Sequence, residues 1–119
     1  MLDYAKVGGD ANPIHVDPVA AAKSRFGQQV VHGMLSAGLF GTAMAACIPG
    51  AIYMNQKLAF TAPVFIDETV VARIEVQEID RQKVTCSTVA YKVNKDDSRT
   101  PVVEGAASVL VPQEYLEDA

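Results

Sequence analysis

Residues 8–15, Gly-Gly-Asp-Ala-Asn-Pro-Ile-His, bring a carboxylate, an amide and an imidazole together within a few positions. Pro13 disfavours helix at Asn12, so we expect a bend that points Asp10 and His15 the same way. A carboxylate and an imidazole on one pocket wall can carry general acid–base catalysis, since one group takes a proton while the other returns one. An ordinary surface turn with His15 in solvent has the same composition, and spacing alone leaves this alternative open.

The segments on either side of this bend are predicted to be short helices. Residues 2–7 are expected to form a helix that ends at Gly8, because glycine favours the left-handed conformation that closes a helix. Asp17 is predicted to cap a second helix, residues 18–25, which has proline at its first position. The catalytic turn, residues 8–17, then lies directly before the positive end of that helix.

A long uncharged stretch predicts the central helix. No aspartate, glutamate, lysine or arginine lies between Arg25 and Lys57, and residues 33–47 are apolar or small on every side. A helix that is hydrophobic all round is buried in a core or spans a membrane, and a span needs about 20 apolar residues. This run is shorter, so we expect a buried helix and no membrane partner. Gly38 and Gly41 each cost about 1 kcal/mol relative to alanine in a helix, which predicts a closely approaching backbone or ligand.

The second half of the chain is predicted to form a sheet. From residue 51 the hydrophobic pattern alternates with a period of two, and four strands fit within residues 51–111, with turns at 80–83 and 94–99. A buried helix followed by antiparallel strands indicates an α+β fold in which a curved sheet wraps the helix. Because the last strands are apolar and an unpaired edge attracts pairing, we expect a homodimer that joins sheet edges.

Composition limits the class of protein. A chain of 119 residues, half of them hydrophobic, fits one folded domain over residues 1–119. The net charge of −4 gives no basic field for nucleic acid. Cys47 and Cys86 are far apart and belong to no metal-binding pattern, so we expect a reducing compartment and no metal. The first four residues lack the features of a signal peptide, which makes the cytoplasm the expected location.

Several motifs carry a resemblance to a known family. They are Tyr4, the segment 9–17 with its Asp-x-Asn-Pro-x-His element, the Val-His-Gly-Met of residues 31–34, and residues 53–65. Together they resemble the MaoC-like (R)-specific enoyl-CoA hydratases. The resemblance implies a hot-dog fold, a homodimer, and the addition of water to trans-2-enoyl-CoA to give (R)-3-hydroxyacyl-CoA. Family members begin with a further strand before the first helix, so the resemblance also predicts a sheet that lacks this N-terminal strand.

The resemblance assigns roles to four residues. Asp10 and His15 match the catalytic pair, Asn12 the motif asparagine, and Gly33 the glycine whose N–H helps to bind the thioester oxygen. The chemistry agrees independently: water needs a base to attack an enoyl thioester, and negative charge then moves to the thioester oxygen. Asp10 and His15 can hold one water, with either as the base. Unpaired N–H groups where the central helix begins suit the oxyanion.

Other residues near this site have weaker assignments. His32 is expected to bond a loop carbonyl and hold the start of the helix, rather than to touch substrate. The acyl chain is expected to contact Met34, Gly38 and Leu39. One lysine would bind the phosphates of coenzyme A, which is part of the substrate rather than a cofactor; the candidates are Lys57, Lys92 and Lys95.

Three alternative functions remain open. The same residues could dehydrate 3-hydroxyacyl groups on acyl-carrier protein, which is the reverse reaction on another carrier. A hot-dog acyl-CoA thioesterase would activate water at the carbonyl carbon, and the nearby His15 argues against it, because that reaction has less need of a proton donor to carbon. A non-catalytic acyl-CoA-binding module would keep its affinity after loss of both Asp10 and His15, with no turnover in the parent protein.

Overall fold

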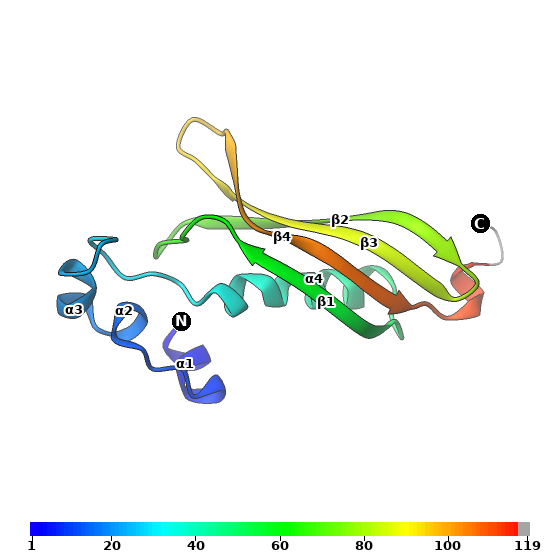
Figure 1. Ribbon diagram of the computed structural model, residues 1–119, viewed down its shortest axis with the longest axis horizontal. Helices are drawn as coiled ribbons and strands as arrows, with labels where there is room; N and C mark the ends of the chain where they lie inside the picture. Colours follow the sequence, from blue (N-terminus) through cyan, green and yellow to red (C-terminus); the bar gives the residue numbers. More distant parts are fainter. Residues whose placement is uncertain (117–119) are drawn as a thin grey trace.

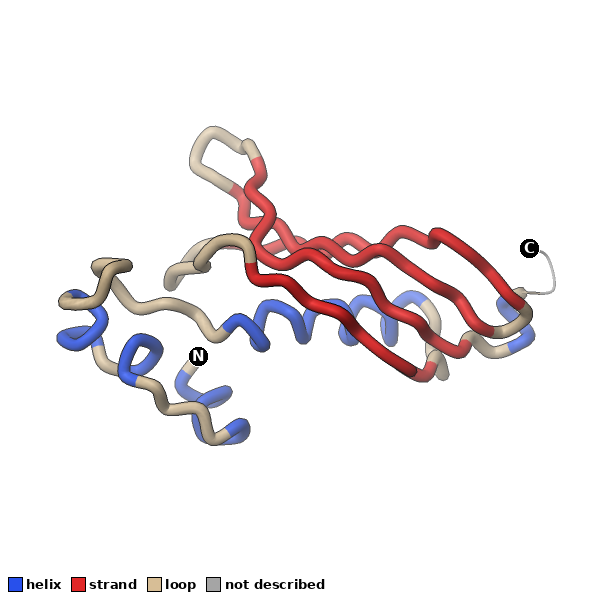
Figure 2. Tube along the Cα trace, in the orientation of Figure 1, coloured by secondary structure: helices blue, strands red, loops and turns tan. Residues whose placement is uncertain are grey.

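The computed structural model describes residues 1–116, so residues 117–119 of the predicted single domain lie outside the described part. The elements form two layers, with one long helix against a sheet, and three short helices lie beyond the first end of that helix (Figures 1 and 2). The predicted α+β class is confirmed. In chain order the elements are α1 (Leu2–Gly8), α2 (Pro13–Val16), α3 (Pro18–Ala22), α4 (Gly33–Cys47), β1 (Ile52–Phe60), β2 (Thr69–Asp80), β3 (Lys83–Val93), β4 (Arg99–Leu110) and a 3₁₀ helix (Gln113–Tyr115).

The four strands form one antiparallel sheet in the order β1-β4-β3-β2. The predicted turns connect β2 to β3 and β3 to β4, where Arg81 and Asp97 take positive φ values of 57° and 67°. The expectation that the last strands form the edges is wrong, because β4 inserts between β1 and β3. The unpaired edges of the sheet are therefore β1 and β2.

Helix α4 begins at Gly33 and ends at Cys47, as predicted, but its burial differs from the prediction. One face, with Ser36, Ala37, Phe40 and Met44, is buried against the sheet. The opposite face is exposed along its length, and Met34 is 54% exposed. The expectation of burial on every side is wrong for the single chain, because one sheet covers only one side of a helix. No helix among the described residues is both long and apolar enough to cross a membrane.

The short helices show how local sequence sets their ends. Asp17 caps α3 as predicted, because its Oδ1 accepts the N–H groups of Val19 at 3.0 Å and Ala20 at 3.3 Å. Helix α3 ends at Ala22 rather than residue 25. Ser24 accounts for this early end: its hydroxyl donates to the Ala21 carbonyl at 2.7 Å and accepts the Phe26 N–H at 3.2 Å, which turns the chain out of the helix.

The sheet requires glycine at one position in β4. Gly105 lies between Leu58 of β1 and Thr88 of β3, and a Cβ there would collide with the Lys57 carbonyl oxygen. The two backbones therefore approach more closely than any side chain allows. This contact fixes β1, the strand whose last residue, Phe60, reaches the cavity described below.

We expect Gly105→Ala to lower the free energy of unfolding by about 1–3 kcal/mol, because β1 must move away from β4. Urea denaturation followed by circular dichroism measures the change. The matched control is Glu104→Ala, an exposed position on the same strand, which should change stability by less than about 0.5 kcal/mol. Equal unfolding midpoints for the two variants would contradict the packing argument.

Candidate active site

A cavity of about 440 Å³ lies where α4 begins, between the short helices and the segment that follows β1. Most of its wall is apolar, with Phe60, Val64, Val102 and Val103 among the lining residues. The polar side chains that line it come from α1, from the turn at residues 8–17, from the segment after α3, from the start of α4 and from the segment after β1. The sequence-predicted residues in the wall are Tyr4, Asp10, His15, His32, Gly33 and Met34.

Asp10 and His15 meet in this cavity, with Asp10 Oδ2 lying 3.8 Å from His15 Nε2. The Asp10 side chain is 53% exposed, whereas the His15 side chain is 11% exposed. The turn organises the carboxylate, because its Oδ1 accepts the Asn12 N–H at 3.1 Å and leaves Oδ2 facing the imidazole. The alternative of an ordinary turn with His15 in solvent is wrong, because His15 is buried.

One hydrogen bond fixes the tautomer of His15. Its Nδ1 lies 2.6 Å from the Val30 carbonyl oxygen. A carbonyl oxygen only accepts, so Nδ1 carries a hydrogen and donates it. The nitrogen that faces Asp10 is therefore Nε2, which holds a lone pair when the ring is neutral and an N–H when it is charged. Nε2 is the atom through which His15 can exchange a proton.

His32 contacts both Asp10 and His15. Its Nε2 donates to the backbone carbonyl of Asp10 at 2.8 Å, and its ring stacks on His15 with centroids 4.0 Å apart and planes at 26°. The Tyr4 ring lies against its other side, with a centroid distance of 4.7 Å. His32 is 2% exposed and makes no side-chain cap of α4. It thus bonds a loop carbonyl, one of its expected contacts, and that carbonyl belongs to Asp10.

Four hydrogen bonds hold the two site segments, residues 10–15 and 29–32, against each other. Two are the histidine bonds to Asp10 and Val30 already described. The others run from the Val30 N–H to the Ile14 carbonyl at 2.9 Å and from the Gln29 side chain to the His15 carbonyl at 2.8 Å. We call this set the clamp. It crosses 14 to 22 sequence positions, so short-range spacing does not reveal it.

The start of α4 offers N–H donors at the cavity. Gly33 and Met34 are the first residues of the helix and both line the cavity, and neither N–H has a hydrogen-bond acceptor within residues 1–116. A helix start concentrates such unpaired N–H groups and partial positive charge. Gly33 also permits close packing, since a Cβ there would lie 2.6 Å from a ring carbon of Phe60.

Several expected contacts are not brought to the cavity. Gly38 and Leu39 are absent from its wall, and no group outside the helix lies within 4 Å of a Cβ position at Gly38 or Gly41. The close approach of a backbone is wrong for the single chain, because this face of α4 points away from the sheet. The alternative of a ligand there stays a prediction.

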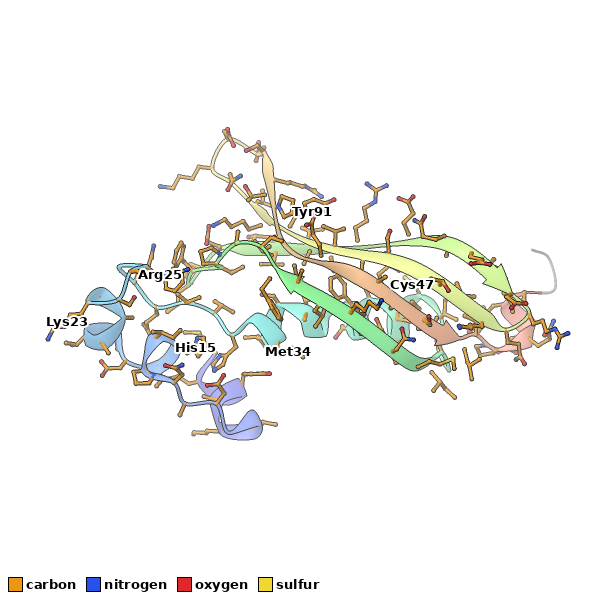
Figure 3. All side chains as sticks on the ribbon, viewed as in Figure 1. His15, Lys23, Arg25, Met34, Cys47 and Tyr91 are labelled. Carbon is orange, nitrogen blue, oxygen red and sulfur yellow. The ribbon has the colours of Figure 1, made fainter. Side chains whose placement is uncertain are left out.

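The three lysines proposed for phosphate binding also lie outside the wall. Lys57 is exposed on the edge strand β1, and Lys95 lies in the turn between β3 and β4. Lys92 contacts the Glu68 carboxylate at 3.6 Å and the Pro63 carbonyl at 3.1 Å. Arg25, which sequence reasoning overlooked, does line the cavity (Figure 3). A basic side chain shortly before the Val-His-Gly-Met segment was the available signal.

Two further ionisable groups lie in the core. Burial raises the pKa of the Cys86 thiol, and burial together with the nearby Cys86 raises the pKa of Tyr53. Both groups stay neutral near pH 7, so neither is a candidate acid or base for the cavity. Cys47 and Cys86 are both free.

Asp10, His15 and His32 form a group that could hold a metal ion. Each offers one ligand atom, and these atoms lie within 4.8 Å of one another. A cation would use Nε2 of His15 and Nδ1 of His32, because the other ring nitrogens are bonded to carbonyl oxygens. The expectation of a metal-free site stays a prediction.

Comparison with known proteins identifies the family. The profile of the MaoC like domain matches residues 1–97. An (R)-specific enoyl-CoA hydratase from Rhodospirillum rubrum is 40% identical over 117 residues, covering 92% of this chain and 75% of that protein. A mitochondrial 3-hydroxyacyl-[acyl-carrier-protein] dehydratase from Arabidopsis thaliana is 34% identical over 113 residues, covering 92% of this chain. The chain spans 66% of the length of the Arabidopsis protein.

The solved structures agree on the architecture. The (R)-hydratase from Aeromonas caviae involved in PHA biosynthesis superposes with a TM-score of 0.84 at 34% identity, covering 93% of this chain and 84% of that one. The α+β architecture is the predicted hot-dog fold. On the family profile and these relatives, the chain belongs to the MaoC-like domain family.

Proposed function

We propose that this protein adds water to trans-2-enoyl-CoA to give (R)-3-hydroxyacyl-CoA, and catalyses the reverse dehydration. The observation that carries the proposal is the approach of Asp10 Oδ2 to His15 Nε2, at 3.8 Å, in a mostly apolar cavity. Hydration needs one group to remove a proton from water and another to deliver a proton to carbon. A carboxylate beside an imidazole supplies both groups. The relatives from Rhodospirillum rubrum and Aeromonas caviae are named as enzymes with this activity.

In the proposed reaction, one water molecule lies between Asp10 and His15. One group takes a proton from it, its oxygen bonds to C3 of the enoyl chain, and the other group gives a proton to C2. After turnover the pair has exchanged one proton, and the short distance between them allows that proton to return. The Nδ1–H bond of His15 to Val30 restricts this exchange to Nε2.

The start of α4 is the proposed oxyanion site. As the C–O bond forms, negative charge moves to the thioester oxygen. The N–H groups of Gly33 and Met34 can donate to this oxygen without breaking a bond inside the protein. Placing the thioester there leaves its double bond facing Asp10 and His15, which line the same cavity.

We expect Asp10→Asn and His15→Ala each to lower kcat on crotonyl-CoA by about 100-fold or more, the size typical of a lost general acid or base. Loss of the enoyl absorbance measures the rate. The control is Asp3→Asn, an exposed carboxylate on α1 that is absent from the cavity wall. The proposed reaction uses no metal, so added EDTA leaves the parental rate unchanged. Near-parental rates in either folded site variant would remove that residue from the mechanism.

His32 is proposed as a positioning residue that acts through Asp10 and His15. It donates to the Asp10 carbonyl and stacks on the His15 ring, so it restricts the orientation of both groups. The hydrogen bond and the ring can be separated by substitution. Glutamine keeps an N–H donor at the position of Nε2, and phenylalanine keeps the flat ring.

We expect His32→Phe to lower kcat by about 10-fold with KM unchanged, because a lost hydrogen bond of about 1 kcal/mol or more frees the Asp10 backbone. His32→Gln should recover most of this loss. Steady-state kinetics and thermal melting are measured on both variants. If kcat follows the melting temperature in both, or if glutamine recovers nothing, the hydrogen bond to Asp10 does not position the carboxylate.

The crotonyl-CoA assay separates two of the three alternatives from hydration. Dehydration of 3-hydroxyacyl groups on acyl-carrier protein is favoured by the Arabidopsis relative and uses the same residues. A thioesterase would release free thiol from crotonyl-CoA without loss of the enoyl absorbance. A binding module would do neither and would keep its affinity in the Asp10 and His15 variants.

A cytoplasmic location stays a prediction, since the Arabidopsis relative is named mitochondrial.

The homodimer is proposed to form through the exposed edge of β1. Ile52 and Met54 on this strand are 62% and 53% exposed, and the strand has no partner on its outer side among the described residues. An unpaired apolar edge is a template for strand pairing. Two β1 strands related by a two-fold axis would join the sheets of two copies.

We expect the protein to be a dimer by light scattering at micromolar concentration, and Met54→Lys to shift it towards monomer by placing a charge at the joined edge. Val76→Lys is the matched control, because Val76 is equally exposed, at 53%, on the other edge strand, β2. A monomeric parent, or dissociation by the Val76 variant alone, would contradict pairing through β1.

A further inference from the structure

Arg25 is the positively charged side chain at the cavity. It follows the end of α3, is exposed, and is the one lysine or arginine in the wall formed by the described residues. Its guanidinium carbon lies 4.9 Å from the centre of the Phe26 ring, which also lines the cavity. No carboxylate lies within salt-bridge distance of Arg25 in residues 1–116, in contrast to Lys92 with Glu68 and Arg73 with Glu75.

The sequence around Arg25 adds to the positive charge. Residues 18–66 contain Lys23, Arg25 and Lys57 and no aspartate or glutamate, in a chain whose net charge is −4. The side of the cavity formed by this segment is therefore free of acidic groups that would neutralise Arg25. Figure 3 places Arg25 at the same end of the molecule as His15, while Lys23, the residue directly after α3, lies further out towards that end.

We propose that Arg25 binds a phosphate of the pantetheine-bearing carrier, and so selects thioesters of coenzyme A or acyl-carrier protein over simple thioesters. This inference rests on the proposed function. A guanidinium presents a planar set of donors that fits phosphate oxygens, and stacking on an aromatic ring restricts its orientation. Both carriers have a phosphate at the end of the pantetheine arm, so the shared chemistry is the phosphate.

Depth in the cavity supports this assignment. The His15 imidazole is buried and Arg25 is exposed, so His15 marks the inner end of the cavity and Arg25 its solvent side, where the carrier end of a substrate would lie. A cavity of about 440 Å³ suits the thioester and a short acyl chain, and the bulky carrier must extend past its rim. A free cation at that rim meets the first charged group of the carrier.

The test compares substrates with and without phosphate. We expect Arg25→Ala to raise KM for crotonyl-CoA by about 10-fold or more with kcat unchanged, the size of one lost hydrogen bond to a charged group. KM for crotonyl N-acetylcysteamine, which has no phosphate, should not change. Arg25→Lys should recover part of the loss. Lys23→Ala, two positions earlier and outside the cavity wall, should change neither substrate.

Crotonyl-acyl-carrier protein distinguishes the two sources of phosphate. An equal rise in KM on both carriers supports contact with the pantetheine phosphate they share. A rise on coenzyme A alone would place the contact on its nucleotide phosphates and overturn the selection of acyl-carrier protein. An unchanged KM for crotonyl-CoA, or an equal rise for the N-acetylcysteamine thioester, would overturn the proposal.

Failure of the proposed function can be distinguished from failure of the phosphate contact at Arg25. If the parent protein hydrates neither thioester, the proposed function is wrong. The role of Arg25 is then decided by calorimetric titration of coenzyme A itself into the parent and Arg25→Ala proteins. A Kd about 10-fold weaker in the variant supports the phosphate contact, and equal affinities or no binding to the parent reject it.

Discussion

The site depends on the clamp, the four hydrogen bonds that join residues 10–15 to residues 29–32. Each histidine of the site donates to a backbone carbonyl of the opposite segment, so the side chains and the main chain fix each other. Loss of one bond therefore affects both segments. The same contacts bury His15 and His32, which a turn of this composition would otherwise leave in water.

The clamp places two groups with opposite environments side by side. Asp10 stays half exposed and accepts a backbone N–H, which suits a charged carboxylate, whereas His15 is covered by Val30 and His32. Helix α4 adds N–H groups without an acceptor in residues 1–116 at the same cavity, because the first N–H groups of a helix have no intrahelical partner. Its first residue is a glycine, on which Phe60 packs closely.

Much of the fold was predictable because it follows from local pattern. The bounds of α4, the cap at Asp17 and the turns between the last three strands come from residues close together in sequence. Predictions that depended on how distant elements pack against each other were wrong. These were burial on every side of α4 and a sheet edge formed by the last strand, β4. In the site, the spacing of Asp10 and His15 allowed a pair, and the family resemblance singled that pair out. The contact of His32 with Asp10 and the position of Arg25 in the cavity wall could not be predicted from the sequence.

By itself, the sequence determined the turn after α1, the helix starts and the alternation of the strands, since these depend on backbone preferences within a few residues. It also carried the family motif. Only the tertiary structure decided which carbonyl His32 bonds, which cation reaches the cavity and which strands remain unpaired. These outcomes depend on segments that are distant along the chain, and their contacts form only when the sheet and α4 pack together.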